Sequence, residues 1–135
     1  MKKNNFNALM KILEPTINQA LFLSGTVIKN RAKKNFKPAK RVGVTSSGKI
    51  KYAVPQSLGS IHERTGELRL SIQESPVQNF SITVGTSKKY ALVNELGGAF
   101  IPARPFLKPA AFESKEEIKN IFFRLLGGKI KVNIK

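Results

Sequence analysis

The stretch Tyr90–Phe112, YALVNELGGAFIPARPFLKPAAF, is the most informative part of this chain. The glycine pair at 97–98 can adopt the positive φ that ends a helix. Pro102 and Pro105 fix φ and hold the residues before them extended. Pro109 suits the first turn of a helix, where its missing N–H is not needed. The stretch therefore predicts a short helix, a glycine turn and a second helix that begins at a proline.

Two side chains are expected to fix the geometry of this stretch. Phe106 is apolar, lies between two prolines and stands where the last helix must dock, so we expect it to anchor the core. Glu95 is expected to form an ion pair across the turn with Arg104, or else with Arg69. The alternative is that these are independent surface charges, whose pairing contributes about 0–1 kcal/mol.

The N-terminal part of the chain predicts a long amphipathic helix. Apolar or small residues recur at three- and four-residue steps from Phe6 to Ile28 and form one stripe. Pro15 lies inside this pattern and is expected to kink the helix or restart it. The polar face continues to about Phe36, and Pro38 ends it. Because a small sheet cannot cover so long a stripe, we expect part of it to contact a neighbouring subunit.

The middle of the chain predicts hairpins and one short helix. Residues 42–54 are typical of a hairpin with its turn at 46–48, and 56–64 has the composition of a loop. Thr65 is expected to cap a helix over 66–70, because its hydroxyl can accept an early backbone N–H. A second strand pair is predicted from Ile72, with a break at Pro76 and a return through Phe80, Ile82 and Val84.

The C-terminal part predicts a helix followed by a strand. Ser114-Lys115-Glu116-Glu117 matches a capping box, so periodicity alone starts the last helix at 115. Gly127-Gly128 is expected to stop this helix. Residues 129–135 then alternate strictly, which predicts a final edge strand. The buried stripe of the helix is expected at Ile118, Ile121, Phe122 and Leu125.

These elements define the expected fold as α+β, in a single domain over residues 1–135. We expect the long N-terminal helix and the C-terminal helix to pack on a mainly antiparallel sheet of about four strands. The chain has no cysteine, which excludes disulfides and thiolate metal sites. No signal peptide or membrane span is apparent, so we expect a soluble protein made in a cytoplasm.

The charge is strongly basic and unevenly distributed. Twenty-four Lys and Arg against eight acidic residues give +16, and residues 1–51 hold twelve of the cations against one Glu. Such a field attracts polyanions or an acidic partner surface, and the plain alternative is a solubilising face. The densest run could follow a phosphate backbone without reading sequence; its members are Lys29, Arg31, Lys33, Lys34, Lys37, Lys40 and Arg41.

The residues that catalysis or metal binding would require are scarce. His62 is the one histidine, and beside Glu63 it has no nucleophile to complete a triad. Glu116 and Glu117 suit the first turn of a helix, where negative charge opposes the helix dipole. No glycine-rich phosphate loop is present. We therefore expect no enzymatic activity, no cofactor and no metal.

The chain resembles the tail-component family of long-tailed bacteriophages, the neck or tail-completion proteins found where head meets tail. The similarity covers roughly residues 64–126. Gly98 stands where relatives more often carry Thr. The matching positions, called the motif residues below, are Gly66, Leu68, Arg69, Ser71, Ile72, Tyr90, Ala91, Glu95, Gly97, Arg104, Pro105, Phe106, Leu107, Pro109 and Ala110.

The resemblance implies a structural virion protein and an earlier start of the last helix, near Pro109. It implies a ring of about six copies that meets head-completion or connector proteins and tail-tube or tail-terminator proteins. The protein would be synthesised in the cytoplasm of the bacterial host and would have no membrane partner. The second hypothesis is a nucleic-acid-binding module, independent of base sequence, that uses the basic segment 29–41.

Overall fold

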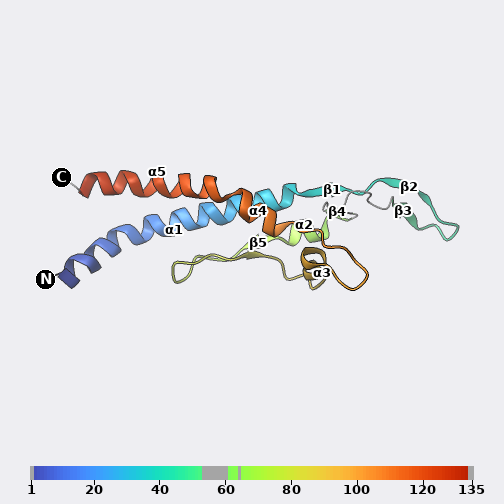
Figure 1. Ribbon diagram of the computed structural model, residues 1–135, viewed down its shortest axis with the longest axis horizontal. Coiled ribbons are helices and arrows are strands. Elements are labelled where there is room, and N and C mark those ends of the chain that lie inside the picture. The colour runs from blue at the N-terminus through green and yellow to red at the C-terminus, as the bar shows by residue number, and fades with distance from the viewer. Residues whose placement is uncertain (1, 53–60, 64, 134–135) are drawn as a thin grey trace.

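The computed structural model describes residues 2–52, 61–63 and 65–133 of the chain (Figure 1). The helices are α1 (Lys2–Lys34), α2 (Glu67–Ser71), α3 (Tyr90–Leu96), α4 (Leu107–Glu113) and α5 (Lys115–Asn133). The strands are β1 (Phe36–Pro38), β2 (Arg41–Val44), β3 (Ile50–Tyr52), β4 (Ile61–Glu63), β5 (Gln73–Glu74) and β6 (Val84–Gly85). Helices combined with small, mostly antiparallel sheets confirm the predicted α+β class.

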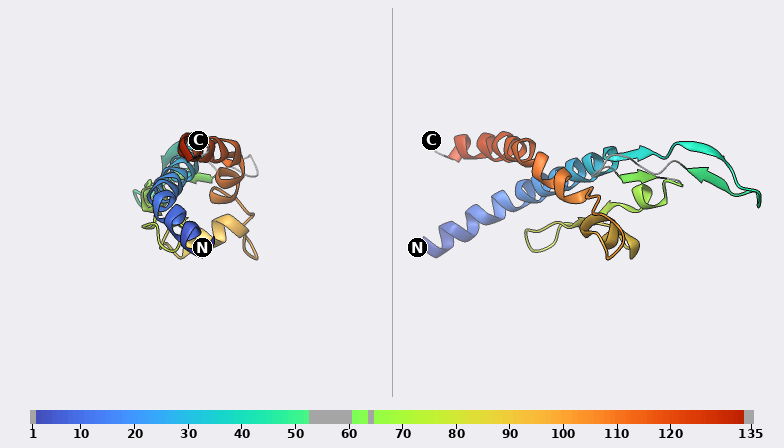
Figure 2. Two further views of the ribbon diagram at one scale, coloured as in Figure 1. Left: turned by 90° about the vertical axis from the view of Figure 1, so that its left-hand side faces the viewer. Right: turned by 45° about the vertical axis from the view of Figure 1, so that its right-hand side comes forward.

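The molecule is elongated, with α1 as its spine. Helices α4 and α5 and the strands β5 and β6 all contact α1. Figure 1 shows α5 running beside α1 at one end of the molecule, whereas the β2–β3 hairpin projects from the other end. Figure 2 shows that α1 and α5 diverge toward the start of α1 and the end of α5. The chain therefore spreads along one long helix instead of closing around a central core.

The elongated shape leaves an unusually large surface in water. The accessible surface is 10102 Å². A compact monomer of the same mass, 14.9 kDa, exposes about 7000 Å². The excess is thus about 3000 Å². Surface of this extent is characteristic of a chain that buries part of itself against other chains.

The strands form three separate pairs, which corrects the predicted single sheet of about four strands. β2–β3 and β5–β6 are antiparallel, and β1–β4 is parallel. Each pair is only two to four residues long. The pairs are separate because α1 supports β1 and the β5–β6 pair directly, so the strands do not need one another to bury a common face.

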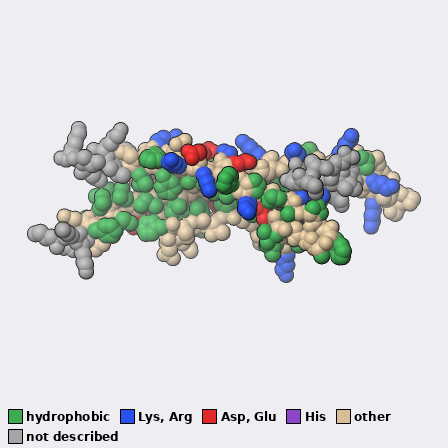
Figure 3. Space-filling view, viewed as in Figure 1, with side chains coloured by type: hydrophobic (Ala, Val, Ile, Leu, Met, Phe, Trp, Pro, Cys, Tyr) green, Lys and Arg blue, Asp and Glu red, His purple; other side chains and the backbone are tan. Residues whose placement is uncertain are grey.

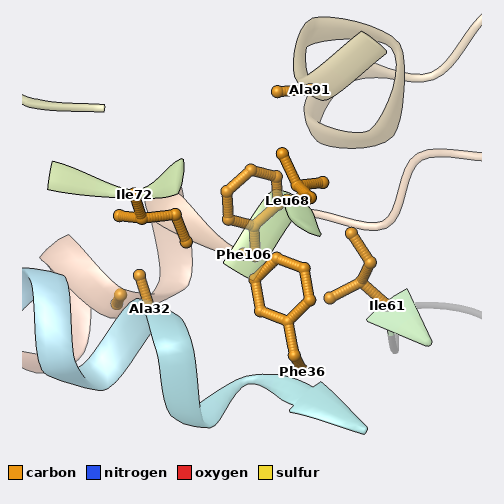
Figure 4. Close-up of a cluster of buried hydrophobic side chains, with 8 residues drawn as sticks. Ala32, Phe36, Ile61, Leu68, Ile72, Ala91 and Phe106 are labelled. Atoms are coloured by element: carbon orange, nitrogen blue, oxygen red, sulfur yellow. The ribbon is translucent and has the colours of Figure 1, made fainter. Parts of the chain in front are cut away.

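The core is small and lies where α1 ends. Ile72 and Phe106 are fully buried, and the rings of Phe36 and Phe106 pack at a centroid distance of 5.1 Å. Figure 4 shows these two rings at the centre of the cluster. The burial of Phe106 confirms it as a core anchor. The cluster consists of Ala32, Phe36, Ile61, Leu68, Ile72, Ala91, Phe106 and Ala110.

The predicted N-terminal helix is present, and it passes through Pro15 without a restart. Proline removes one backbone hydrogen bond, but several hydrogen-bonded helical turns precede and follow Pro15 and keep the helix continuous. The apolar stripe of α1 is buried only in part. Ala20 and Ser24 are buried, whereas Leu9 and Phe6 nearer the N-terminus are 40% and 61% exposed. The uncovered part of the stripe is the part expected to contact a neighbouring subunit.

The last helix begins in two steps. α4 begins at Leu107 with Pro109 in its first turn, and α5 follows directly at Lys115. The predicted capping box does not form, because the hydroxyl of Ser114 donates to the Ala110 carbonyl at 2.6 Å instead. The start near Pro109, which the resemblance implied, therefore corresponds to α4. The start at 115, which periodicity implied, corresponds to α5.

The predicted helix stop at Gly127-Gly128 and the final strand are wrong. α5 continues to Asn133, so 129–133 is helical, and 134–135 lies outside the described residues. A glycine costs a helix interior about 1 kcal/mol, which cooperative extension of an established helix can offset. Ile121 is buried, and Ile118, Phe122 and Leu125 are half-buried as the predicted stripe. The alternation of residues 129–135 is thus too short to form a strand when the established helix α5 can continue through it.

The hairpin predicted over 42–54 is present as β2 and β3, with Gly48 at φ 84° in its turn; residues 53–54 lie outside the described part. The loop predicted over 56–64 is wrong at 61–63, which forms β4 and pairs with β1; the rest of it is not described. Ile61 is buried in the core, and this burial accounts for the strand.

The helix predicted over 66–70 is present, and the strand pair that follows it is present in part: Ile72 caps the end of α2, and Phe80 lies in a turn with φ 56° instead of in the return strand. α2 starts one residue later than expected, and the hydroxyl of Thr65 accepts the Glu67 N–H at 3.4 Å. β5 and β6 form the predicted strand pair, and the Ser75 N–H extends it by donating to the Thr83 carbonyl at 2.7 Å.

One ion pair fastens the β5–β6 hairpin to α1. The ammonium group of Lys29 lies 2.7 Å from the Glu74 carboxylate, and both side chains are largely covered. The hydrogen bond from Lys29 is the main reason that the pKa of Glu74 is lowered from its ordinary value of 4.5. The ionised carboxylate is thus favoured by folding.

We predict that Phe106→Ala lowers the free energy of unfolding by about 3–5 kcal/mol, because it leaves a cavity at the centre of the core. Chemical denaturation measures this loss. Phe112→Ala is the matched control, since Phe112 is 66% exposed, and it should cost under about 1 kcal/mol. A loss below about 1 kcal/mol for Phe106→Ala would contradict the assigned core.

We predict that Glu74 contributes to acid sensitivity. Its folded pKa lies below 4.5, so its stabilising effect is complete above the unfolded pKa and is lost as the pH falls through the folded pKa. Glu74→Gln should therefore remove part of the fall in unfolding free energy seen in titrations below about pH 5. Glu14→Gln is the control, because no described ion pair involves this exposed residue. Equal acid profiles for wild type and Glu74→Gln would refute the assignment.

Candidate interaction surfaces

The motif residues build the frame of the fold. Leu68, Ile72 and Phe106 lie in the core with Ala91 and Ala110, and Leu107 packs against it. Gly66 and Gly97 hold positive φ angles of 75° and 82° at the ends of helices. The hydroxyl of Ser71 donates to the Leu68 carbonyl at 2.7 Å and shares a second hydrogen bond with the Thr86 hydroxyl. Tyr90 begins α3 and is 46% exposed.

Glu95 caps helix α4 from a distance. Its Oε2 accepts the backbone N–H groups of Phe106 and Leu107 at 2.9 and 3.1 Å, and its Oε1 accepts that of Lys108 at 2.7 Å. The next residue, Pro109, has no N–H to satisfy. One carboxylate and one proline thus account for every free donor at the start of α4, and the negative charge lies at the positive end of the helix.

The ion pair expected between Glu95 and Arg104 or Arg69 is absent from the structure. Arg69 donates to the carboxylate of Glu63, with Nε 2.8 Å from Oε2. The backbone N–H of Arg104 donates to the Asn94 carbonyl at 2.6 Å, and its buried Nε has no hydrogen-bond partner among the described residues. Glu95 does not form the expected ion pair because three converging backbone N–H groups already satisfy its carboxylate, and Arg69 is held by Glu63.

The loop between α3 and α4 is held in one conformation. Gly97 has φ 82° and ψ 166°, a combination that essentially only glycine adopts. A Cβ here would lie 3.0 Å from the backbone nitrogen of Ala103. The Gly98 N–H donates to the Ile101 carbonyl at 2.8 Å and closes the turn. The tip of this rigid turn carries Phe100, whose side chain is 99% exposed.

Two exposed apolar surfaces lie apart on the molecule. The α3 surface consists of Tyr90, Leu92, Val93, Leu96, Phe100 and Ile101, all exposed. The open stripe is the N-terminal part of the apolar side of α1 and consists of Phe6, Leu9 and Ile12, which are exposed, and Leu13, which is half-buried. Figure 3 shows hydrophobic side chains gathered along the N-terminal half of α1. Contiguous apolar surface on this scale marks interaction sites.

The predicted basic run divides between internal and exposed positions. Lys29 pairs with Glu74, and Arg31 pairs with Glu117 at 2.8 Å, so these two cations are partly neutralised. Lys33 is half-buried and Lys34 is exposed at the end of α1. The other three, Lys37, Lys40 and Arg41, are exposed at the base of the β2–β3 hairpin.

The hairpin adds two cations that the sequence run does not contain. β3 folds back beside β2 and pairs Lys51 with Gly43, while Lys49 stands at the turn. We call the hairpin, together with residues 37–40 that lead into it, the basic arm; its exposed cations are Lys37, Lys40, Arg41, Lys49 and Lys51. No ion pair between described residues involves any of the five. The alternating pattern of 42–54 with its central turn was the signal that could have placed Lys49 and Lys51 here.

The residues considered for catalysis lie in structural positions. His62 lies in β4 opposite Lys37 of β1, and Glu63 beside it binds Arg69. Glu117 pairs with Arg31, and Glu116 is exposed in the first turn of α5. Within 2–52, 61–63 and 65–133, no three His, Asp or Glu residues are grouped as a metal site. None of the described helices has the length and apolar character of a membrane span.

Comparisons with known proteins give no match: no protein-family model, no curated protein and no solved structure is detectably similar to this chain.

We predict that Glu95→Ala lowers the free energy of unfolding by about 1–2 kcal/mol, because it leaves three N–H groups, two of them partly buried, without their carboxylate acceptor. Glu95→Gln keeps one acceptor oxygen and should lose less. Chemical denaturation of both variants measures the difference. Glu116→Ala, in the exposed first turn of α5, is the control for loss of a helix-dipole charge and should cost about 0.3–1 kcal/mol. Equal losses for Glu95→Ala and Glu116→Ala would contradict the capping role.

Proposed function

We propose that this protein is a structural component of a bacteriophage virion, located in the neck or upper tail, where it acts in tail completion and head–tail joining as part of an oligomeric ring. The observation that carries the proposal is the arrangement of the motif residues. The three elements of the motif, 66–72, 90–97 and 104–110, are separate in sequence. Their side chains meet in one unit made of the Phe106 core and the Glu95 cap.

The arrangement supports the proposal because the motif residues serve to stabilise the fold: they form the core and the cap of α4 and do not assemble a catalytic group of side chains. A frame protein acts through its shape and its surfaces. The elongated form and the excess surface of about 3000 Å² are in keeping with a subunit that completes its packing in an assembly. The proposed partners are further copies of the chain, in a ring of about six, and the connector and tail-tube or tail-terminator proteins on either side.

The test is made in the particle. Mass spectrometry of purified virions should find this chain in several copies per particle, and gold labelling should place it at the head–tail junction. Phages that lack the gene should accumulate unjoined heads and tails. The proposal fails if the chain is absent from virions and particles without the gene still join. Genes for portal, head-completion and tail-tube proteins beside this gene would support the same conclusion independently.

A second candidate is nucleic-acid binding independent of base sequence, and the basic arm favours it. Five exposed cations lie on the projecting hairpin or on the segment that leads into it, without an ion-pair partner among the described residues. Such an arm could follow a phosphate backbone by charge alone. Within the ring proposed above, the same arm would face the DNA that passes through; as a separate module, it would act without the ring.

We predict that random duplex DNA binds the isolated protein weakly and with a steep dependence on salt. Replacing Lys40, Arg41, Lys49 and Lys51 with alanine should reduce the slope of log affinity against log salt by about 0.9 for each phosphate that the arm no longer neutralises. The matched control removes four cations outside the arm, Lys11, Lys89, Lys119 and Arg124, all exposed. Fluorescence anisotropy measures both variants. If the control loses as much affinity as the arm variant, net charge alone binds DNA and the arm has no specific role.

A further inference from the structure

The α3 surface and the open stripe differ in form. The α3 surface is a short helix with a turn that projects Phe100, and the turn is fixed by Gly97 and by backbone hydrogen bonds. The open stripe is one face of a long helix. Figure 1 places α3 toward the hairpin and the start of α1 at the opposite end of the molecule. The two surfaces therefore lie in different parts of the same chain, and neither is covered by the rest of that chain.

The amount of exposed surface indicates how many neighbours each copy can bind. A standard protein interface buries about 800 Å² on each partner. A two-fold dimer would use one such patch per copy, whereas a subunit inside a ring uses two, or about 1600 Å². The excess of about 3000 Å² on this chain exceeds the first requirement and accommodates the second. The area thus favours a second copy on each side.

The unlike forms of the two surfaces favour a head-to-tail contact. A two-fold contact joins a patch to itself, whereas a ring contact joins two different patches on neighbouring copies. Phe100 has the properties of a binding anchor, since it is a large aromatic on a rigid support and loses little conformational freedom on docking. The open stripe instead offers apolar side chains at helical spacing, Phe6 among them, on one continuous helix without a projecting turn.

We infer that the α3 surface of one copy, with Phe100 at its centre, docks on the open stripe of the next copy. The inference rests on the ring in the proposed function, for which it names the two contacting patches. The final strand expected over 129–135 would have offered an edge for such a contact, but 129–133 is helical, so the open stripe is the remaining candidate for the second patch.

The absence of cysteine in the chain makes the contact directly testable. Ala99→Cys puts a thiol beside Phe100, and Asn5→Cys puts one beside the open stripe; both positions are exposed. Each variant is treated at high concentration with a short flexible bismaleimide, which traps transient contacts. A mixture of the two single variants should give a 1:1 dimer. A chain with both cysteines should give a ladder of dimers, trimers and larger products, and neither variant alone should crosslink.

Phe100→Ser in the double-cysteine chain should reduce the ladder about tenfold or more, as loss of an anchor does. Leu70→Ser is the control, because Leu70 is 61% exposed on α2 and belongs to neither surface; it should leave the ladder unchanged. Dimers from either single variant alone would show a two-fold contact and overturn the inference. No product from the mixture would also overturn it. Virions that contain the chain without this crosslink would retain the proposed function and reject the contact, and a ladder from a chain absent from virions would do the reverse.

Discussion

The bond between the Glu95 carboxylate and the start of α4 is the constraint on which the rest of the structure depends. Three backbone N–H groups converge on this carboxylate, which joins the end of α3 to the start of α4 across the glycine turn. The joint places the Phe106 backbone beside α3, so its ring enters the core against Phe36. The same joint directs the intervening turn outward and exposes Phe100. One electrostatic contact therefore fixes both the inner anchor and the outer surface.

The core is small, and for this reason much of the apolar surface of the chain remains on the outside. Among the described residues, the main cluster contains five large apolar side chains, Phe36, Ile61, Leu68, Ile72 and Phe106, together with three alanines. A long helix supports the remaining elements one at a time. This design stabilises a frame but leaves apolar side chains of α1 and α3 in water. Because burial of apolar surface is the main driving force of association, the free chain holds unused stabilisation that contact with another chain can supply.

Local backbone chemistry could be predicted from the sequence, and non-local pairing could not. Prolines and glycines restrict the backbone within a few residues, so the helix–turn–helix of 90–112 and the turn at Gly48 were predictable. From the sequence, an arginine was the expected partner of Glu95. Its actual partners, three backbone N–H groups, converge only when α4 lies beside α3 in the folded chain. β4 pairs with β1 across a long separation, and the final residues join a helix whose packing on α1 outweighs their alternation. Lys49 and Lys51, by contrast, join the basic arm through the β2–β3 hairpin, which the pattern of 42–54 did predict.

The few acidic residues explain how the basic charge becomes concentrated. All eight are glutamates, and six have fixed structural partners. Five form ion pairs, namely Glu63, Glu67, Glu74, Glu113 and Glu117, and Glu95 caps α4. Their partners lie in the body of the molecule, so the body neutralises part of its own charge while the basic arm keeps all of its cations. The unpaired cations of the basic arm thus stand on a thin projection of the molecule, where a polyanion or an acidic protein surface could approach without meeting the α3 surface or the open stripe.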